Sequence, residues 1–598
     1  MGISPVAVFS DADRGALHSR VADEAVGIGS SYLNIERIID AAARANAGAI
    51  HPGYGFLAEN ADFAEACAKA SIIFIGPSPK TIRMMGLKTG GRDIAASAGV
   101  PIIPAYHSGD ASEMKFPVLI KASAGGGGRG MRIVEEASAL PEAIASAQRE
   151  AERAFGDGSL LIERYIRDAR HIEFQIFGDQ HGNLIHLFER DCSMQRRYQK
   201  IIEETPSPAL NDDLRRRMGE AAIAIGRAIG YQNAGTVEFL LAPSGEFFFI
   251  EVNTRIQVEH PVTELVTGLD LVRLQIDVAE GKRLPKNPQS IGHAIEARLY
   301  AEDPANGFLP TTGTIHRWRS PENVRVDAAL EDGVQVGIQY DPLLAKVTSY
   351  GMDREAALRK LVYALRSITT LGVGTNREYL MQILESPEFR EGRVHTAFLP
   401  PARPATFRDH VIAAALYTAR ACPTPFPYFR NNPYRDPSIK LRVAGDEVAV
   451  SWKRTGDDGY SVNGREVSVV STGSGAIALD IDGVVRSFEI FEADGKIFVH
   501  SPDADVTIER LPRHPRPAGA AKHATANAPM PGQVLRILVR EGQSVKMGDS
   551  LVVLEAMKME QTIRTTINGR VQSVLVKTGQ VVRPGQMLVE IGAEENES

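Results

Sequence analysis

Residues 235–264 carry the densest set of side chains that could do chemistry. Glu238 comes first. Further along, from residue 251 to residue 259, a polar residue occupies every second position: Glu251, Asn253, Arg255, Gln257 and Glu259. If the second segment stays extended, these five side chains project to one side, because side chains in a strand alternate with a period of two. Apolar residues 247–250 precede the row and favour a polar face that lines a cleft. An ordinary exposed strand is the alternative.

The oxygen atoms in this row suit a hard cation. Glu238 and Glu251 lie on the two arms of a hairpin expected to turn at residues 242–245, so strand pairing would bring their carboxylates together. With the side-chain carbonyl of Asn253 they suit Mg²⁺ bridging nucleotide phosphates. Arg255 and Gln257 would hold a small planar anion, and Glu259 could take a proton from it.

A run of glycines at residues 125–128 follows Lys121. Backbone amides in such a loop can close over phosphates, with Lys121 supplying positive charge. The spacing fits neither a Walker A loop nor a dinucleotide fingerprint. A flexible linker is the alternative, although apolar residues 117–120 and a second expected strand flank the loop.

Lys558 lies between two methionines at the turn of an expected hairpin, residues 550–565. The surrounding chain repeats with an offset of 37 residues, as between Gly532 and Gly569 or Val545 and Val582. Such self-similarity predicts a duplicated, short-stranded unit. The turn presents Lys558 to another protein. An ordinary surface lysine and a lipoyl carrier are the alternatives.

The Ala-Met-Lys-Met motif at residues 556–559, with Ala-Pro-Met-Pro-Gly at 528–532, resembles the biotinyl carrier domain of biotin-dependent carboxylases. The resemblance implies covalent biotin on Lys558, attached by a biotin protein ligase. Residues 5–399 are similar to the biotin carboxylase component of the ATP-grasp superfamily, through Lys121 with its glycine loop, the Glu238, Glu251 and Asn253 set, and the Arg-Ile-Gln-Val-Glu-His motif at 255–260.

The second resemblance implies roles for individual residues. ATP would be held by Lys88, Lys121, Gly126, Gly127, Gly128, Glu163, His171, Gln195, Lys200 and Leu240. Mg²⁺ or Mn²⁺ would be held by Glu238, Glu251 and Asn253, and bicarbonate by Arg255, Gln257, Val258 and Glu259. Tyr54 and Arg325 would form the biotin pocket. Catalysis would rest on Glu259 as the base, on Arg255 and Lys200, and on Arg325 as the group that stabilises the biotin enolate.

The elements that must position these residues predict a multidomain chain with α/β and α+β parts. Alternating strands and helices over residues 5–74 predict a parallel layer. Compared with the family the chain begins one strand and one helix late, so we expect a truncated Rossmann-like domain with altered dimer contacts. Asn463-Gly, Asp482-Gly and Asp494-Gly predict tight turns in a small antiparallel β-barrel accompanied by one helix, Arg408–Arg420.

The expected domains are therefore 1–83, the carboxylase N-terminal domain; 84–290, the ATP-grasp domain; 291–400, the carboxylase C-terminal domain; 401–511, the barrel; 512–528, a Pro/Ala-rich linker; and 529–598, the all-β carrier. The barrel resembles the subunit-docking domain of acyl-CoA carboxylase α subunits of the propionyl and methylcrotonyl type. That resemblance implies a separate carboxyltransferase β subunit and a hetero-oligomer. The helix and the aromatic stretch 426–433 are expected to offer the partner apolar surface.

Composition excludes several other classes of function. A net charge of −7 over 598 residues provides no basic field for nucleic acid. The three cysteines lack metal-ligand spacing and suit a reducing compartment, and no apolar run is long enough to span a bilayer. We therefore expect a cytoplasmic protein.

Together these features predict ATP- and bicarbonate-dependent carboxylation of biotin on the chain's own carrier, feeding the separate carboxyltransferase. One alternative is a non-catalytic carrier and docking subunit whose carboxylase region is disabled. Another is an ATP-grasp ligase unrelated to biotin. The sequence does not identify the acyl-CoA, because no part of the chain remains for a carboxyltransferase.

Overall fold

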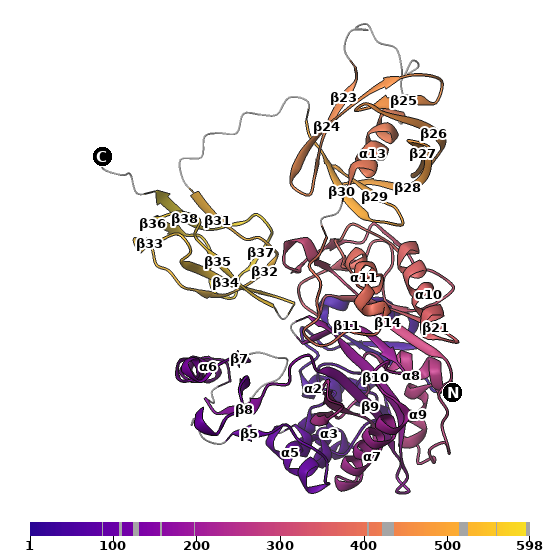
Figure 1. Cartoon of the computed structure of the whole chain (residues 1–598), viewed down its shortest axis with the longest axis vertical. Coiled ribbons are helices and arrows are strands. Elements are labelled where there is room, and N and C mark those ends of the chain that lie inside the picture. The colour runs from indigo at the N-terminus through magenta and orange to yellow at the C-terminus, as the bar shows by residue number, and fades with distance from the viewer. Residues whose placement is uncertain are drawn as a thin grey trace.

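The computed structural model describes residues 1–86, 88–106, 111–122, 131–155, 158–196, 198–403, 406–420, 436–512, 524–557 and 559–593. Three bodies are visible in Figure 1: the expected carboxylase region (residues 1–403), a barrel above it and the expected carrier beside it. No helix among the described residues is long and apolar enough to cross a membrane.

The N-terminal part is a small parallel α/β layer, as the alternation of apolar runs predicts. β1 (Val6–Phe9) pairs with β2 (Glu24–Gly27), and β3 (Ala49–Ile50) pairs with β4 (Ile73–Phe74), both in parallel. The helices are α1 (Leu17–Val21), α2 (Ile35–Arg44), α3 (Ala61–Lys69) and α4 (Pro79–Met85). In α2 the Asn34 side chain caps the first turn, and Ile38, Ala41 and Ala42 face the core.

An eight-stranded sheet forms the centre of the carboxylase region. Its order is β13-β12-β9-β10-β11-β14-β21-β19. The strands are β9 (Arg170–Gly178), β10 (Leu184–Arg196), β11 (Gln199–Thr205), β12 (Asn233–Leu241), β13 (Phe247–Asn253), β14 (His293–Tyr300), β19 (Arg325–Ala328) and β21 (Leu343–Gly351). β11 pairs with β14, so one sheet joins the parts expected to be separate ATP-grasp and C-terminal domains.

Helices and smaller sheets surround this central sheet. A four-stranded sheet with the order β5-β8-β6-β7 consists of β5 (Ala105–Tyr106), β6 (Val118–Ala122), β7 (Arg132–Val134) and β8 (Leu160–Arg164), covered by α6 (Leu140–Phe155). The other helices are α5 (Lys88–Ser97), α7 (Asp212–Ala228), α8 (His260–Thr267), α9 (Leu271–Ala279), α10 (Arg354–Ser367), α11 (Arg377–Leu384) and α12 (Pro387–Arg390). Short pairs are β15 (Glu302–Asp303) with β16 (Leu309–Pro310), β17 (Gly313–Thr314) with β20 (Gln335–Val336), and β18 (Arg317–Arg319) with β22 (Thr369–Leu371).

The barrel closes because β23 pairs with both β24 and β30. Its strands are β23 (Ser438–Val443), β24 (Asp446–Arg454), β25 (Gly459–Val462), β26 (Arg465–Gly473), β27 (Ala476–Ile481), β28 (Val484–Ala493), β29 (Lys496–His500) and β30 (Asp505–Arg510). Asn463, Asp482 and Asp494 have positive φ and each is followed by glycine, which confirms the predicted tight turns.

Helix α13 (Arg408–Arg420) lies in the core of the barrel, as Figure 1 shows. Its residues Ala413 to Leu416 have no exposed surface and pack with side chains from all parts of the barrel wall. The expectation that this helix offers apolar surface to a partner is therefore wrong, because the barrel already covers it. The aromatic stretch 426–433 lies outside the described residues.

Two four-stranded sheets form the expected carrier, with the orders β31-β38-β36-β33 and β35-β34-β32-β37. The strands are β31 (Ala524–Asn527), β32 (Gly532–Ile537), β33 (Ser544–Val545), β34 (Ser550–Ala556), β35 (Met559–Arg564), β36 (Gly569–Val574), β37 (Val581–Val582) and β38 (Met587–Ala593). The bounds of β32, β33 and β34 recur 37 residues later in β36, β37 and β38, which confirms the internal repeat. β31 pairs with β38, so residues 524–527 of the expected linker belong to this sheet.

A fully buried arginine, Arg377, joins the barrel to the carboxylase region. From the start of α11 it donates hydrogen bonds to the carbonyl oxygens of Ser501 (3.1 Å) and Pro502 (3.5 Å), and it forms an ion pair with Asp505 at 3.2 Å. The backbone N–H of Asp505 in turn donates to Glu378 at 3.0 Å. The barrel is therefore attached through a guanidinium group that water does not reach.

Candidate active site

Lys200 lies at the centre of a buried cluster of charged side chains. Its Nζ atom is 2.5 Å from Oε2 of Glu173, 2.5 Å from Oε1 of Glu259 and 3.3 Å from Oε1 of Glu238. These three carboxylates come from β9, from the turn before α8 and from β12. One ammonium group thus gathers acids from three parts of the chain.

Strand register explains why so many acids meet here. Glu173 on β9 lies opposite Glu238 on β12, which in turn lies opposite Glu251 on β13. Carboxylates directly opposite one another on neighbouring strands repel. Two cations compensate for this repulsion: Lys200 on β11, whose strand partner is Gln195, and the buried Arg190 on β10, which donates to Glu173 at 2.6 Å. The expected pairing of Glu238 with Glu251 is therefore present in the sheet.

Glu259 is fully buried and both of its oxygens are paired. Oε1 accepts from Lys200, and Oε2 accepts from Nη2 of Arg298 on β14 at 2.8 Å. Burial alone would raise the pKa of Glu259, but Lys200, Arg298 and Arg190 outweigh it and hold the pKa well below its ordinary value. Glu259 is therefore an ionised carboxylate at neutral pH.

Other titratable groups of the cluster have raised pKa values, a shift opposite to that of Glu259. Burial, helped by the neighbouring acids, raises the pKa of Glu173 and raises that of Glu203 to about 8. Burial opposes the charge of Lys200, yet the surrounding acidic groups hold its pKa well above the ordinary value. Groups pushed apart in this way mark sites where acid–base chemistry is arranged.

The polar row 251–259 is not one extended strand. β13 ends at Asn253, and bends and a turn follow before α8 begins at His260, with Pro261 in its first turn. Hydrogen bonds nevertheless hold these side chains together. Asn253 and Gln257 each donate to Oε1 of Glu238, at 2.9 Å and 3.2 Å. Arg255 donates to Gln257 at 2.6 Å. The expected grouping is present, but hydrogen bonds rather than strand alternation produce it.

Glu59 extends this group into the N-terminal layer. It accepts from Nε of Arg255 at 2.8 Å and from the backbone N–H of Thr254 at 3.0 Å. Sequence reasoning missed Glu59, although it lies close in the sequence to Tyr54, which was assigned to the biotin pocket. It ties the loop after β3 to the segment that carries Arg255.

The expected metal ligands lie together at the edge of the cluster. Glu238 and Glu251 are opposite each other on the sheet, and the Asn253 side chain contacts Glu238. His171 approaches Oε2 of Glu238 at 2.9 Å, and ligand atoms of His171, Glu173 and Glu238 lie within 4.8 Å of one another. Carboxylate and amide oxygens are the donors that Mg²⁺ and Mn²⁺ prefer, so these residues fit such an ion.

The expected nucleotide residues fall into two groups. Lys121 on β6 contacts Glu163 on β8, which also contacts Arg92 of α5, a residue that sequence reasoning missed. His171 and Gln195 contact each other at 2.7 Å beside Glu238, and Leu240 is opposite His171 on β12. The backbone of Lys88 begins α5. Its side chain and Gly126, Gly127 and Gly128 lie outside the described residues.

The two residues expected in the biotin pocket both lie near Lys346. The ring centroid of Tyr54 is 5.9 Å from Nζ of Lys346, which donates to the carbonyl oxygen of Val258 at 2.8 Å. Arg325 instead pairs with Glu264 at 2.5 Å and with Asp327 at 2.9 Å, and Asp327 lies 3.2 Å from Lys346. The guanidinium group that contacts Glu259 belongs to Arg298.

Comparison with known proteins accounts for most of the chain. Four family models match: "Biotin carboxylase, N-terminal domain" at residues 1–82, "Carbamoyl-phosphate synthase L chain, ATP binding domain" at 92–287, "Biotin carboxylase C-terminal domain" at 296–401 and "Biotin-requiring enzyme" at 524–591. The mitochondrial methylcrotonoyl-CoA carboxylase subunit alpha of Mus musculus is 39% identical, over 94% of this chain and 86% of its own. The propionyl-CoA carboxylase alpha chain of Ruegeria pomeroyi is 38% identical, over 94% and 92%.

The chain belongs to the α subunits of biotin-dependent acyl-CoA carboxylases. A solved relative, the biotin carboxylase domain of the Hydrogenobacter thermophilus 2-oxoglutarate carboxylase in complex with MgADP and bicarbonate, is 43% identical with a TM-score of 0.64 and covers 69% of this chain and 93% of that domain. The α subunit is thus an ATP-dependent biotin carboxylase that carries its own biotinyl domain. The predicted architecture of ATP-grasp domain, closed eight-stranded barrel and biotinyl domain is confirmed.

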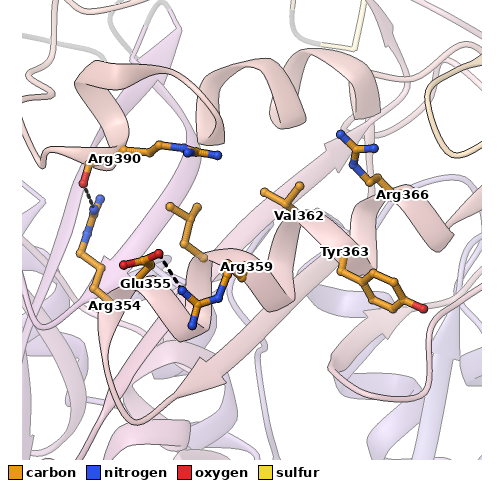
Figure 2. Close-up of a pocket in the computed structure, with 8 residues that line it drawn as sticks. Arg354, Glu355, Arg359, Val362, Tyr363, Arg366 and Arg390 are labelled. Atoms are coloured by element: carbon orange, nitrogen blue, oxygen red, sulfur yellow. Dashed lines mark hydrogen bonds and ion pairs between the residues drawn. The ribbon is translucent and has the colours of Figure 1, made fainter.

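A separate hollow of about 590 Å³ lies on the outer face of α10 in this α subunit, and Figure 2 shows its lining. Arg354 is paired with Glu204 at 2.6 Å, Arg359 with Glu355 at 2.6 Å, and Arg366 with Glu385 at 3.0 Å. Because its basic side chains are largely committed to these ion pairs, and because none of the residues around Glu259 lines it, the hollow is no part of the candidate active site.

Proposed function

We propose that this α subunit uses ATP and bicarbonate to carboxylate biotin attached to Lys558, and that a separate carboxyltransferase β subunit then passes the carboxyl group to an acyl-CoA. The observation that carries the proposal is the buried Glu259, held ionised between Lys200 and Arg298. Lys558 itself lies outside the described residues. Burying these charges costs desolvation free energy, which a non-catalytic carrier would not need to spend.

Glu259 would accept the proton of bicarbonate. In the structure its pKa is too low for an efficient general base, because Lys200 and Arg298 both face it. An anion entering beside these cations shares their charge, so the pKa of Glu259 rises towards the range that suits proton transfer. Arg255, Gln257 and the backbone at Val258 would orient that anion.

Arg325 would stabilise the negative charge that develops on biotin during carboxyl transfer, as the sequence interpretation proposes. Its guanidinium group is paired with Glu264 and Asp327. Arg298 is a second candidate for this role. Arg298 is buried, contacts Glu259 directly and donates to Glu203 at 2.6 Å. Preorganised buried donors of this kind are worth more than partly exposed ones. Arg325 and Tyr54 would border the biotin pocket beside Lys346.

Glu238, Glu251 and Asn253 would hold Mg²⁺ or Mn²⁺, which when bound offsets the charge of the nucleotide phosphates. Lys121 would add its own positive charge at the phosphates, with Glu163 and Arg92 orienting its ammonium group. The amides of Gly126, Gly127 and Gly128 and the side chain of Lys88 would close over them. His171, Gln195 and Leu240 would border the remainder of the nucleotide.

The decisive experiment measures bicarbonate-dependent ATP hydrolysis with free biotin. Glu259→Gln should lower the rate by roughly two to four orders of magnitude, the usual contribution of a general base, with little change in nucleotide binding. Glu251→Ala should weaken Mg-nucleotide binding as well. Equal loss of binding in both variants would contradict the division between metal and bicarbonate sites, and an inactive wild type would support the non-catalytic carrier.

Biotin attachment is tested by intact mass after expression with a biotin protein ligase. The wild type should gain the mass of one biotin, and Lys558→Ala should gain none. A wild type without added mass would instead favour an ATP-grasp ligase unrelated to biotin.

The barrel would dock the β subunit in a hetero-oligomer. Because α13 is covered, the docking surface must lie on the outside of the barrel, where Val484 and Val485 at the β27–β28 turn are 50% and 58% exposed. Val484→Asp with Val485→Asp should abolish co-purification with the β subunit and leave ATP hydrolysis with free biotin unchanged. Unchanged co-purification would place the docking surface elsewhere.

We also propose a reducing, cytoplasmic location. Cys67 and Cys192 are free thiols that lie buried in the structure, which suits a compartment where disulfides do not form. Fractionation of cells that produce the protein tests this proposal, and recovery in an organelle fraction would contradict it.

A further inference from the structure

Two apolar side chains of the carboxylase region pack against the core of the carrier. Leu309 on β16 and Ile338 just after β20 are each partly buried, and both join the apolar cluster formed by β32, β34, β36 and β38. In Figure 1 the side of the carrier labelled β32 and β37 faces the carboxylase region, whereas β33 and β36 lie on the far side. The sheet of β32 and β37 also contains β34 and β35, the strands between which Lys558 lies in the sequence.

Ile338 is connected to the candidate active site through a group of aromatic rings. Two residues later, the ring of Tyr340 lies 5.8 Å from Phe56 and 5.8 Å from Tyr32. Phe56 is in the same turn as Tyr54, whose ring lies beside Lys346. Lys346 donates to the carbonyl oxygen of Val258, the residue before Glu259. The loop that contacts the carrier thus also borders the proposed biotin pocket.

Leu309 is connected to the site from another direction. It pairs with Asp303 across the short β15–β16 ladder, next to Glu302. Glu302 accepts from Nη2 of Arg196 at 2.6 Å, and Arg196 also stacks on the ring of Phe308 at 4.3 Å. Arg196 follows Gln195, one of the proposed nucleotide residues. Both residues that contact the carrier therefore belong to elements that are connected to the candidate active site.

We propose that Leu309 and Ile338 form the docking surface on which the chain's own carrier rests while its biotin enters the carboxylase site. The inference rests on the function proposed above. Two partly buried apolar residues bury little area, which gives a contact that forms and separates readily. A carrier that must also visit a carboxyltransferase needs such a contact.

The length of the chain supports the carrier of the same chain as the occupant. The twelve residue steps from Pro512, next to the last barrel strand, to Ala524 of β31 span at most roughly 40 Å when extended. Since the barrel is held to the carboxylase region by Arg377, the carrier stays within that distance of a fixed point. It therefore meets this surface far more often than a second copy would at ordinary protein concentrations.

The test compares two rates in the biotinylated full chain: carboxylation of its own biotin, and bicarbonate-dependent ATP hydrolysis with added free biotin. Leu309→Asp and Ile338→Asp should each lower the first rate about tenfold, equivalent to about 1.4 kcal/mol of docking free energy, and leave the second unchanged. Met352→Asp, a substitution of an exposed apolar residue in the same region, should alter neither rate.

Each other outcome overturns the proposal in a distinguishable way. Unchanged carboxylation of the carrier in both aspartate variants would show that the contact is not used. A parallel fall in both rates would show that the substitutions damage the site rather than docking, and Leu309→Ala with Ile338→Ala repeats the comparison with a milder change. Absence of ATP hydrolysis in the wild type would instead refute the proposed function itself.

A mixing experiment tests the choice of occupant. Lys558→Ala, which has no biotin, is combined with biotinylated Glu259→Gln, which cannot carboxylate. Carboxylation in the mixture should be far slower than in one intact chain and should rise with concentration. A rate equal to that of the intact chain would assign the surface to the carrier of a second copy.

Discussion

The barrel and the carrier both contact the carboxylase region, but by opposite kinds of contact. The barrel is held through Arg377, an arginine with no exposed surface that binds two carbonyl oxygens and an aspartate of the barrel. The carrier touches the same region through two partly buried apolar residues, Leu309 and Ile338. A buried charge that loses its partners is left uncompensated, whereas an apolar contact of this size separates at small cost. The difference indicates that the barrel is fixed to the carboxylase region, whereas the carrier can dock and separate.

Removing the charge should have the largest effect on this difference. Arg377→Ala leaves Asp505 and Glu378 without their buried cation and should destabilise the barrel attachment by about 3–5 kcal/mol. Urea unfolding measures the change. Arg366→Ala is the matched control, because Arg366 also pairs across this boundary, with Asp503 at 3.4 Å, but is partly exposed. That loss should stay below about 1 kcal/mol. Similar small losses in both variants would mean that Arg377 does not hold the barrel.

Acid should loosen the barrel attachment to a smaller extent. Burial lowers the pKa of His410, despite the neighbouring Asp505, Asp409 and Asp503, and its Nε2 contacts Ser501, whose carbonyl oxygen binds Arg377. The folded protein thus keeps His410 neutral, so this stability is present above the ordinary pKa of about 6.5 and is lost as pH falls below it. The slope for one proton is at most about 1.4 kcal/mol per pH unit.

The measurement compares urea unfolding of the wild type and His410→Gln between pH 7.5 and pH 5. The other buried histidines contribute equally to both proteins, so the difference isolates His410. The wild type should lose more stability than the variant over this interval. Parallel curves would show that His410 does not report on the attachment.

Lengthening the connection should have the smallest effect. Twelve Gly and Ser residues added between Pro512 and Ala524 roughly double the connection, which adds about 0.6 kcal/mol to the entropic cost of bringing the carrier back. Carboxylation of the attached biotin should therefore fall about threefold, with no change in urea unfolding or in activity with free biotin. A loss of stability would show that the carrier, like the barrel, is rigidly held.

Features encoded by local pattern could be predicted from the sequence. The 37-residue repeat and the Asn-Gly and Asp-Gly turns depend on neighbouring residues, and both are present. β2 is hard to recognise from the sequence, because Glu24–Gly27 contains a single buried residue, Val26. The prediction that residues 251–259 stay extended is wrong beyond Asn253, because bends and a turn follow before α8 begins.

Features that depend on long-range pairing could not be predicted in the same way. Arg298 approaches Glu259 only because β14 pairs with β11, which joins segments about 90 residues apart. The sequence did contain a signal, since Glu296 and Arg298 alternate with the apolar residues of a strand that is buried throughout. Charged residues in such a strand indicate a site. The roles of the individual site residues, including Lys558 and the glycines at 126–128, stay predictions.

The fixed barrel also determines how strongly the carrier must bind. A connection of a dozen residues that starts from a stationary point holds the biotinyl domain at an effective concentration in the millimolar range around the carboxylase site. At that concentration a docking surface with a millimolar dissociation constant is occupied about half of the time. Stronger contacts at Leu309 and Ile338 would bring no advantage. Tighter binding would slow the release of the carboxylated carrier to the proposed carboxyltransferase.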